Sequence, residues 1–125
     1  DIGVSPIAKT SYLAQLMSNA GSIFSVDASE PRIEALKREA ERMGANIIEP
    51  MIVERDKTPV VGEKADVILL SPRCSGTGVF WREPSLKWRV DLKRVGVMAK
   101  AKWLMITRYA DYVKDRGASS IGRAV

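Results

Sequence analysis

The side chains that could carry out chemistry are few in this sequence. Of its 125 residues one is cysteine, Cys74, and none is histidine. A histidine-based triad, a disulfide framework and the usual zinc sites are therefore excluded, since each needs residues that are absent. Cys74 follows the apolar run 66–71, and Asp27 ends the apolar run 22–27. The candidate chemistry is therefore a thiol and a carboxylate, each near the end of a predicted strand.

The charge of the chain is concentrated in its last third. Residues 1–81 carry 9 basic and 11 acidic side chains, whereas residues 82–125 carry 11 basic and 4 acidic ones. Trp81, Trp88 and Trp103 lie in or beside this basic part. Basic side chains neutralise phosphates and aromatic rings stack on bases, so single-stranded nucleic acid is one candidate partner. The alternative, which composition alone favours, is a solvated basic helix face with tryptophans in a core.

These residues need a scaffold, and the hydrophobic pattern predicts one. The clearest element is a helix that begins after Ser29 as N-cap, tolerates Pro31 in its first turn and stops at Gly44. The pattern predicts further elements: helices over 8–18 and 92–116, strands over 22–27, 46–53 and 66–71, and a loop over 72–89. Pro50 indicates that the strand 46–53 lies at a sheet edge or contains a bulge. This alternation is typical of an α/β three-layer fold with a mostly parallel sheet.

Several short motifs resemble one known family. They are Lys9-Thr10-Ser11, Val26-Asp27-Ala28-Ser29, Pro72-Arg73-Cys74-Ser75-Gly76-Thr77-Gly78, Arg82-Glu83-Pro84 and Leu86-Lys87-Trp88-Arg89. Together they resemble the Sun/Fmu family of RNA cytosine-5 methyltransferases, which use S-adenosylmethionine. The resemblance is strong over about residues 9–92. It implies a Rossmann-like methyltransferase domain, here incomplete, over residues 1–117, followed by a weakly structured tail over residues 118–125.

The resemblance also assigns cofactor-binding positions. Pro6 and Lys9 match the first family motif, but Ile7 and Ala8 stand where the family has two glycines that let the backbone approach the cofactor. By the same resemblance, Asp27 accepts hydrogen bonds from the cofactor ribose and Arg32 lies near the cofactor. Glu54 matches a family aspartate that contacts the adenine side. Each of the first two assignments has a structural alternative. Asp27 would then be an acid at a helix start, and Arg32 a solvated helix residue. We expect a vestigial site and no bound cofactor.

The catalytic positions of the family are altered in this chain. Ser71 stands where the family has an aspartate that activates cytosine, and Cys74 matches a cysteine that assists product release. The family nucleophile belongs to a Thr-Cys motif on a later strand, whereas residues 117–122 contain no cysteine. We therefore expect no catalytic residue to be intact. The resemblance places Arg82, Lys87, Trp88 and Arg89 near RNA.

Three functions follow as alternatives. The first is a non-catalytic fragment, engineered or degenerate; the second is a module that retains RNA or S-adenosylmethionine binding; the third is an active methyltransferase. The family sheet has a central strand ahead of Asp1, so we expect the remaining strands to re-pair, or a second copy to fill the slot in a dimer or domain swap. No metal site and no membrane span are expected. The single cysteine and the absence of a signal-peptide pattern predict a cytoplasmic protein.

Overall fold

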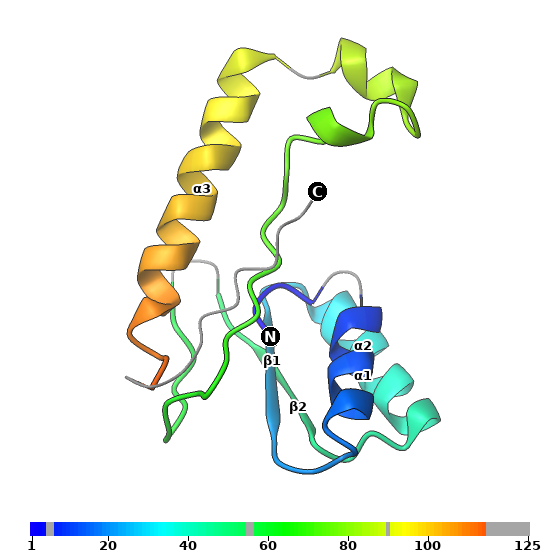
Figure 1. Ribbon diagram of the computed structural model, residues 1–125, viewed down its shortest axis with the longest axis vertical. Coiled ribbons are helices and arrows are strands. Elements are labelled where there is room, and N and C mark those ends of the chain that lie inside the picture. Colours follow the sequence, from blue (N-terminus) through cyan, green and yellow to red (C-terminus); the bar gives the residue numbers. More distant parts are fainter. Residues whose placement is uncertain (5–6, 55–56, 90, 115–125) are drawn as a thin grey trace.

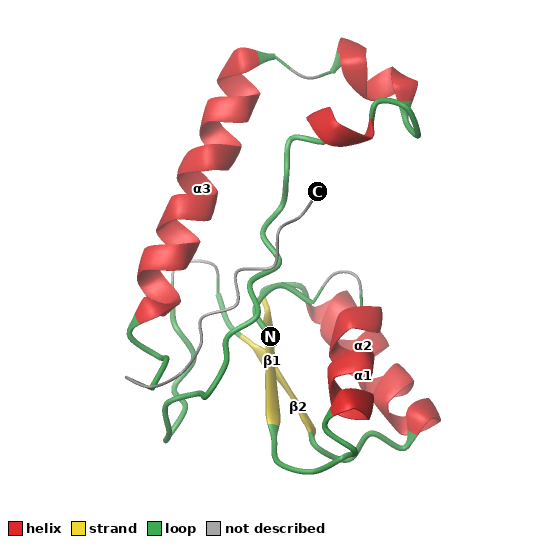
Figure 2. Cartoon of the chain, in the orientation of Figure 1, coloured by secondary structure: helices red, strands yellow, loops and turns green. Residues whose placement is uncertain are grey.

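The structure, a computed structural model, describes residues 1–4, 7–54, 57–89 and 91–114 (Figure 1). The elements in chain order are α1 (Ala8–Leu16), β1 (Ile23–Asp27), α2 (Glu30–Met43), β2 (Ile48–Ile52), the 3-10 helices η1 (Thr77–Val79) and η2 (Pro84–Trp88), and α3 (Leu92–Ala110) (Figure 2). The three predicted helices and the first two predicted strands are confirmed; α2 has the predicted bounds and the other four elements are shorter than predicted. The tail over 118–125 lies outside the described residues.

The sheet is built around a parallel pair. β1 pairs with β2 from Ile23 opposite Ile48 to Asp27 opposite Ile52, and α2 connects them. α1 and α2 lie on one side of the strands and the end of α3 on the other (Figure 1). This arrangement confirms the predicted α/β three-layer class. Within the described residues β2 pairs only with β1, so the edge position that Pro50 predicted is also confirmed.

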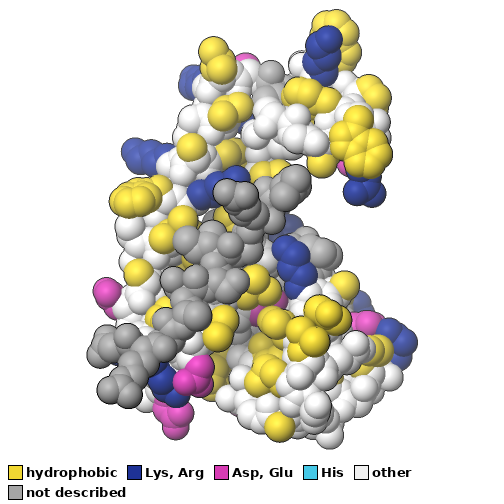
Figure 3. Space-filling view, viewed as in Figure 1, with side chains coloured by type: hydrophobic (Ala, Val, Ile, Leu, Met, Phe, Trp, Pro, Cys, Tyr) yellow, Lys and Arg dark blue, Asp and Glu magenta, His cyan; other side chains and the backbone are white. Residues whose placement is uncertain are grey.

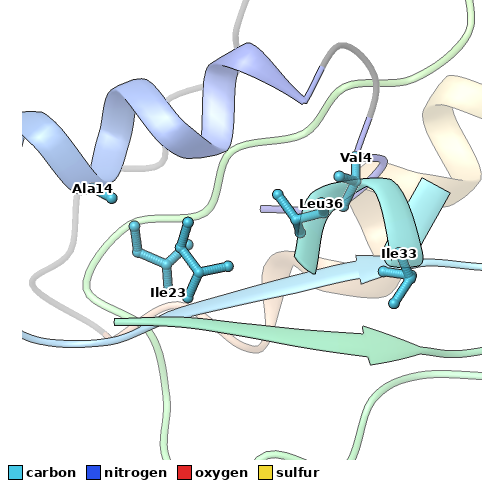
Figure 4. Close-up of a cluster of buried hydrophobic side chains, with 6 residues drawn as sticks. Val4, Ala14, Ile23, Ile33 and Leu36 are labelled. Atoms are coloured by element: carbon cyan, nitrogen blue, oxygen red, sulfur yellow. The ribbon is translucent and has the colours of Figure 1, made fainter. Parts of the chain in front are cut away.

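Two apolar clusters hold the layers together. On the side of α1 and α2, six buried side chains pack against one another (Figure 4): Val4, Ala14, Ile23, Ile33, Leu36 and Ile48. On the side of α3, the buried cluster consists of Ile2, Val26, Ile68, Leu70 and Tyr109. α2 supplies Ile33 and Leu36, three residues apart, because that spacing places both on one helix face.

The first residues of the chain take the carboxyl end of the slot that the sequence predicts to be empty. Ile2 forms parallel bridges with both Val26 of β1 and Leu70. Its amide donates to the Leu69 carbonyl at 2.8 Å, and its carbonyl accepts from the Ser71 amide at 2.9 Å. At this end the two flanking strands therefore do not re-pair with each other, because Ile2 lies between them. Farther from the carboxyl end, residues 66–69 have no strand beside them. The predicted strand 66–71 is therefore reduced to the bridge between Leu70 and Ile2.

α3 ends earlier than predicted and is more exposed. The helix stops at Ala110, and Val113 forms a parallel bridge with Ala65 instead. The apolar residues Val97, Leu104 and Tyr109 are spaced as on one stripe of this helix; Tyr109 is buried, whereas Val97 and Leu104 are more than half exposed. The stripe covers the sheet only at its carboxyl end. Most side chains of its amino-terminal half are exposed.

The amino group of Asp1 predicts a pH-dependent stability for the chain with a free N-terminus. Burial lowers the pKa of this group from 8.0 to about 6, while it donates to the Phe24 carbonyl at 2.7 Å. Between pH 6 and 8 the unfolded chain binds more protons than the folded chain, so stability rises with pH across this window. We expect a gain of about 2–3 kcal/mol.

Urea unfolding at pH 5.5 and 8.5 measures this change. The sequence contains no histidine, so few other groups titrate in the window. Acetylation of Asp1 is the control, because an amide carries no titratable proton there. An equally large pH dependence in the acetylated chain would refute the assignment.

Candidate functional site

Three chain segments meet at the carboxyl ends of the parallel strands, where ligands of open α/β sheets bind. They are the turn at Gly3, the end of β1 at Asp27 and the loop that begins at Ser71. Gly3 has a φ of +86°, and a Cβ built on it would lie 2.8 Å from the Ser71 carbonyl oxygen. Only glycine has the conformational freedom and the lack of a side chain that this approach requires.

The carboxylate of Asp27 is buried and accepts three hydrogen bonds from groups of its own chain. Its Oδ2 accepts from the Val4 amide at 3.1 Å and from the Arg32 guanidinium at 3.2 Å. Its Oδ1 accepts from the Ser29 amide at 2.8 Å. Asp27 thus fixes the Val4 turn to the start of α2, while the Ser29 side chain makes no capping hydrogen bond. The contact with Arg32 makes this pair a near-neutral unit.

Lys9 and Ser71 meet across the same edge, 62 positions apart in the sequence. Lys9 Nζ donates to Ser71 Oγ at 3.2 Å. Within the described residues Lys9 forms no salt bridge, because Ser71 offers a hydroxyl where a carboxylate would have matched its charge. The pair therefore leaves a positive charge at the site.

Two polar residues that the sequence analysis did not single out also lie here. Thr10 Oγ1 donates to Asp1 Oδ2, while Asp1 Oδ1 is buried and has no hydrogen-bond partner in the part of the chain described. The only signal that could have identified them is their place in the stretch 1–10 that resembles the first family motif.

The remaining predicted cofactor and catalytic positions are dispersed. Cys74 is exposed, and Glu54 is exposed and pairs with Lys57 at 2.9 Å. Pro6 lies outside the described residues. The structure therefore brings together Lys9, Asp27, Arg32 and Ser71 at one edge of the sheet, and it does not place Glu54 in a hydrogen bond with any of them.

The basic residues predicted to contact RNA form a separate projection. We call residues 77–89, with η1 and η2, the basic arm; in Figure 3 a hollow separates this part from the α/β body. Trp81 and Trp88 are 79% and 86% exposed. The Arg82 guanidinium lies 5.6 Å from the Trp81 ring centroid, and Lys87 Nζ lies 6.0 Å from that of Trp88. The alternative that places the tryptophans in a core is wrong.

Comparisons with known proteins identify the family of the chain. A family profile described as 16S rRNA methyltransferase RsmB/F matches residues 1–119. The chain belongs to the RsmB/F methyltransferase family. The predicted resemblance to RNA cytosine-5 methyltransferases is thus confirmed for a part of the methyltransferase domain.

Individual relatives agree with this assignment. The chain is 34% identical over 90 residues to the tRNA (cytosine(72)-C(5))-methyltransferase of Pyrococcus horikoshii, covering 70% of this chain and 23% of that protein. It is 30% identical over 119 residues to the probable ribosomal RNA small subunit methyltransferase B of Bacillus subtilis, covering 94% and 27%. The chain therefore spans about a quarter of the length of these two RsmB/F-type relatives.

The fold comparison supports the Rossmann-like methyltransferase architecture. The crystal structure of NSun6 from Pyrococcus horikoshii with SFG matches with a TM-score of 0.83 and 28% identity, over 97% of this chain and 31% of that one. Among the described helices none is long and apolar enough to cross a membrane. The described residues also hold no group of three or more potential metal ligands.

Proposed function

We propose that the chain binds single-stranded RNA through the basic arm and does not itself transfer a methyl group. The observation that carries the proposal is the pair of exposed tryptophans, each with a cation beside its ring. Large aromatic side chains are normally mostly buried, so two of them left in water next to basic residues favour a ligand with stackable faces and negative charge. The relatives that match the chain are RNA methyltransferases by name.

The chemistry of the arm fits a nucleic-acid strand. Arg82, Lys87 and Arg89 outnumber the single acidic residue of the arm, Glu83, and α3 continues the positive charge with Lys93 and Arg94. A base can stack on each tryptophan face while the neighbouring cation neutralises a phosphate. Unpaired bases favour this mode, because bases within a duplex already stack on one another.

Two features of this chain disfavour the binding of S-adenosylmethionine. Asp27 accepts hydrogen bonds from Val4, Ser29 and Arg32, so ribose hydroxyls would compete with the Arg32 guanidinium for this carboxylate. Ile7, where the family has glycine, is at the start of α1 with a φ of −53°, and its side chain packs against the buried cluster that contains Val4 and Ala14. The positive φ that is open to a glycine is therefore not used at this position. The chain therefore lacks the glycine loop of the family, and its ribose carboxylate already has internal partners, which supports the absence of methyl transfer.

RNA binding is tested by fluorescence anisotropy with a labelled single-stranded oligonucleotide. We expect a Kd that rises steeply with salt, since released counterions drive phosphate contacts. Trp88→Ala should weaken binding about 5- to 100-fold, because stacking on one base contributes about 1–3 kcal/mol. Tyr12→Ala is the matched control, since Tyr12 is an exposed aromatic residue on α1, away from the arm. An unchanged Kd in Trp88→Ala, or no binding at about 50 mM salt, would contradict the proposal.

The same protein tests the second half of the proposal. Incubation with RNA and S-adenosylmethionine that carries a labelled methyl group should give no labelled RNA, and calorimetric titration of the cofactor should give no binding heat. Asp27→Asn is the informative variant. A heat in the unmodified chain that disappears in Asp27→Asn would show that the altered site still binds the cofactor.

A further inference from the structure

The two exposed tryptophans of the basic arm belong to different turns of the chain. Figure 2 shows η1 and η2 as separate short helices ahead of α3. Trp81 follows η1, whereas Trp88 is the last residue of η2. The amides of Arg82 and Glu83 both donate to the Val79 carbonyl at 2.9 Å, which closes the turn after η1. Within the described residues no backbone hydrogen bond joins η1 to η2 directly, so the relative position of the two rings depends on side-chain packing.

That packing is concentrated in one contact, between Leu86 of η2 and Gly76, which directly precedes η1. Among residues 81–89, all of which the structure describes, only Leu86 is not exposed. A Cβ built on Gly76 would lie 2.9 Å from Leu86 Cδ1. Gly76 also has a φ of +81°, which glycine adopts without strain. Leu86 therefore packs directly onto the backbone at Gly76, and this contact holds η2 against η1.

Each tryptophan keeps its own cation whether or not the two helices stay together. Arg82 is the chain neighbour of Trp81, and Lys87 is that of Trp88. The guanidinium lies 5.6 Å and the ammonium 6.0 Å from the centroid of the neighbouring ring. The contact of Leu86 with Gly76 thus adds nothing to either ring–cation pair. What it determines is the distance and the orientation of one pair relative to the other.

We propose that Leu86 and Gly76 are positioning residues, which hold the rings of Trp81 and Trp88 in a fixed relation so that one RNA strand binds both. The inference rests on the proposed function, the binding of single-stranded RNA by the basic arm. A strand that has stacked on one ring then meets the second ring at a high effective concentration. Without the contact, the second ring must be ordered during binding, which lowers the affinity.

Leu86→Ala tests the proposal, with Leu92→Ala as the matched control. Both variants truncate a leucine without removing a charge or a ring, and Leu92 is 89% exposed. We expect Leu86→Ala to raise the Kd for an oligouridylate of about 12 nucleotides about tenfold or more, since the two rings then act separately. For a uridine dinucleotide, measured by quenching of tryptophan fluorescence, we expect a change of less than about twofold, because each ring–cation pair is intact. Leu92→Ala should change neither Kd.

Two further measurements separate positioning from a general loss of structure. The urea midpoint of the Leu86→Ala chain should equal that of the Leu92→Ala chain, because Leu86 belongs to neither apolar cluster of the α/β body. Leu86→Met keeps the volume of the side chain, so it should return the Kd for the long strand to within about threefold of the unmodified chain.

The failure of this inference can be distinguished from the failure of the proposed function. Equal Kd values of Leu86→Ala and Leu92→Ala for the long strand would overturn the positioning role and leave RNA binding by the arm intact. An equal loss of affinity for the long strand and the dinucleotide would also overturn it, since the effect would then lie in the individual rings. If the unmodified chain binds neither RNA, the proposed function is wrong and the positioning role is wrong with it.

Discussion

Replacing Leu36 with alanine should remove most of the stability of this chain. Leu36 has no exposed surface and contacts the cluster that joins α1, α2 and β1. Truncation of a buried leucine costs about 2–5 kcal/mol, the sum of lost burial and an unfilled cavity. A domain of this size has about 5–15 kcal/mol of stability in total. The described core holds only eleven buried apolar residues, so we expect the chain to lie near the low end of that range.

Urea unfolding followed by circular dichroism measures this effect. Leu16→Ala on α1 is the matched control, because it makes the same change at a leucine that is 63% exposed. The control should alter stability by less than about 0.5 kcal/mol. Alanine also favours helix at both positions, so the difference between the two variants reports packing. Similar urea midpoints in Leu36→Ala and Leu16→Ala would refute the assignment of the core.

The local elements of the fold could be predicted because their signals are contained in short stretches. Ile33 and Leu36 lie on one face of α2, and Gly44 ends the helix with a φ of +64°, as a left-handed cap requires. β1 and β2 lie within the predicted stretches 22–27 and 46–53. These features depend on residues within one or two turns of one another, which is the range over which a hydrophobic pattern is informative.

The wrong predictions all concern contacts between distant parts of the chain. Residues 66–71 have the composition of a buried strand, but a strand exists only where a neighbour pairs with it, and Ile2 pairs only with the last part. Likewise the spacing of Val97 and Leu104 indicates a helix face without showing what covers it. An apolar stripe indicates which side of a helix can be buried. How much of that side is buried depends on which other elements pack against it.

At the candidate site, too, local features could be predicted and contacts between distant residues could not. Asp27 could be identified from its place at the end of a strand. The engagement of its carboxylate by Val4 could not, because the amide that donates is 23 positions away. The contact of Lys9 with Ser71 spans 62 positions. Substitution of one residue at a site is visible in a sequence, but the partner that fills the vacated position is visible only in three dimensions.

Gly3 lies where the first turn of the chain contacts the loop after Leu70. Gly3→Ala should destabilise the chain by about 2–4 kcal/mol. A positive φ costs an alanine about 1–2 kcal/mol. The new Cβ would also lie 2.8 Å from the Ser71 carbonyl oxygen, which is backbone and cannot rotate away. The segments must then part, which weakens the hydrogen bonds from Ile2 to Leu69 and from Ser71 to Ile2. Each of these contributes about 0.5–1.5 kcal/mol.

Gly44→Ala separates the two causes in Gly3→Ala. Gly44 also has a positive φ, of +64°, but a Cβ there meets nothing within 4 Å, so only the backbone strain of about 1 kcal/mol applies. The difference between the urea midpoints of the two variants therefore measures the contact with Ser71. Hydrogen exchange locates it: the Ser71 amide should exchange faster in Gly3→Ala and remain unchanged in Gly44→Ala. Equal destabilisation with a protected Ser71 amide in both variants would mean that the turn and the loop after Leu70 are not in contact, and the edge that unites Lys9, Asp27 and Ser71 would then not exist.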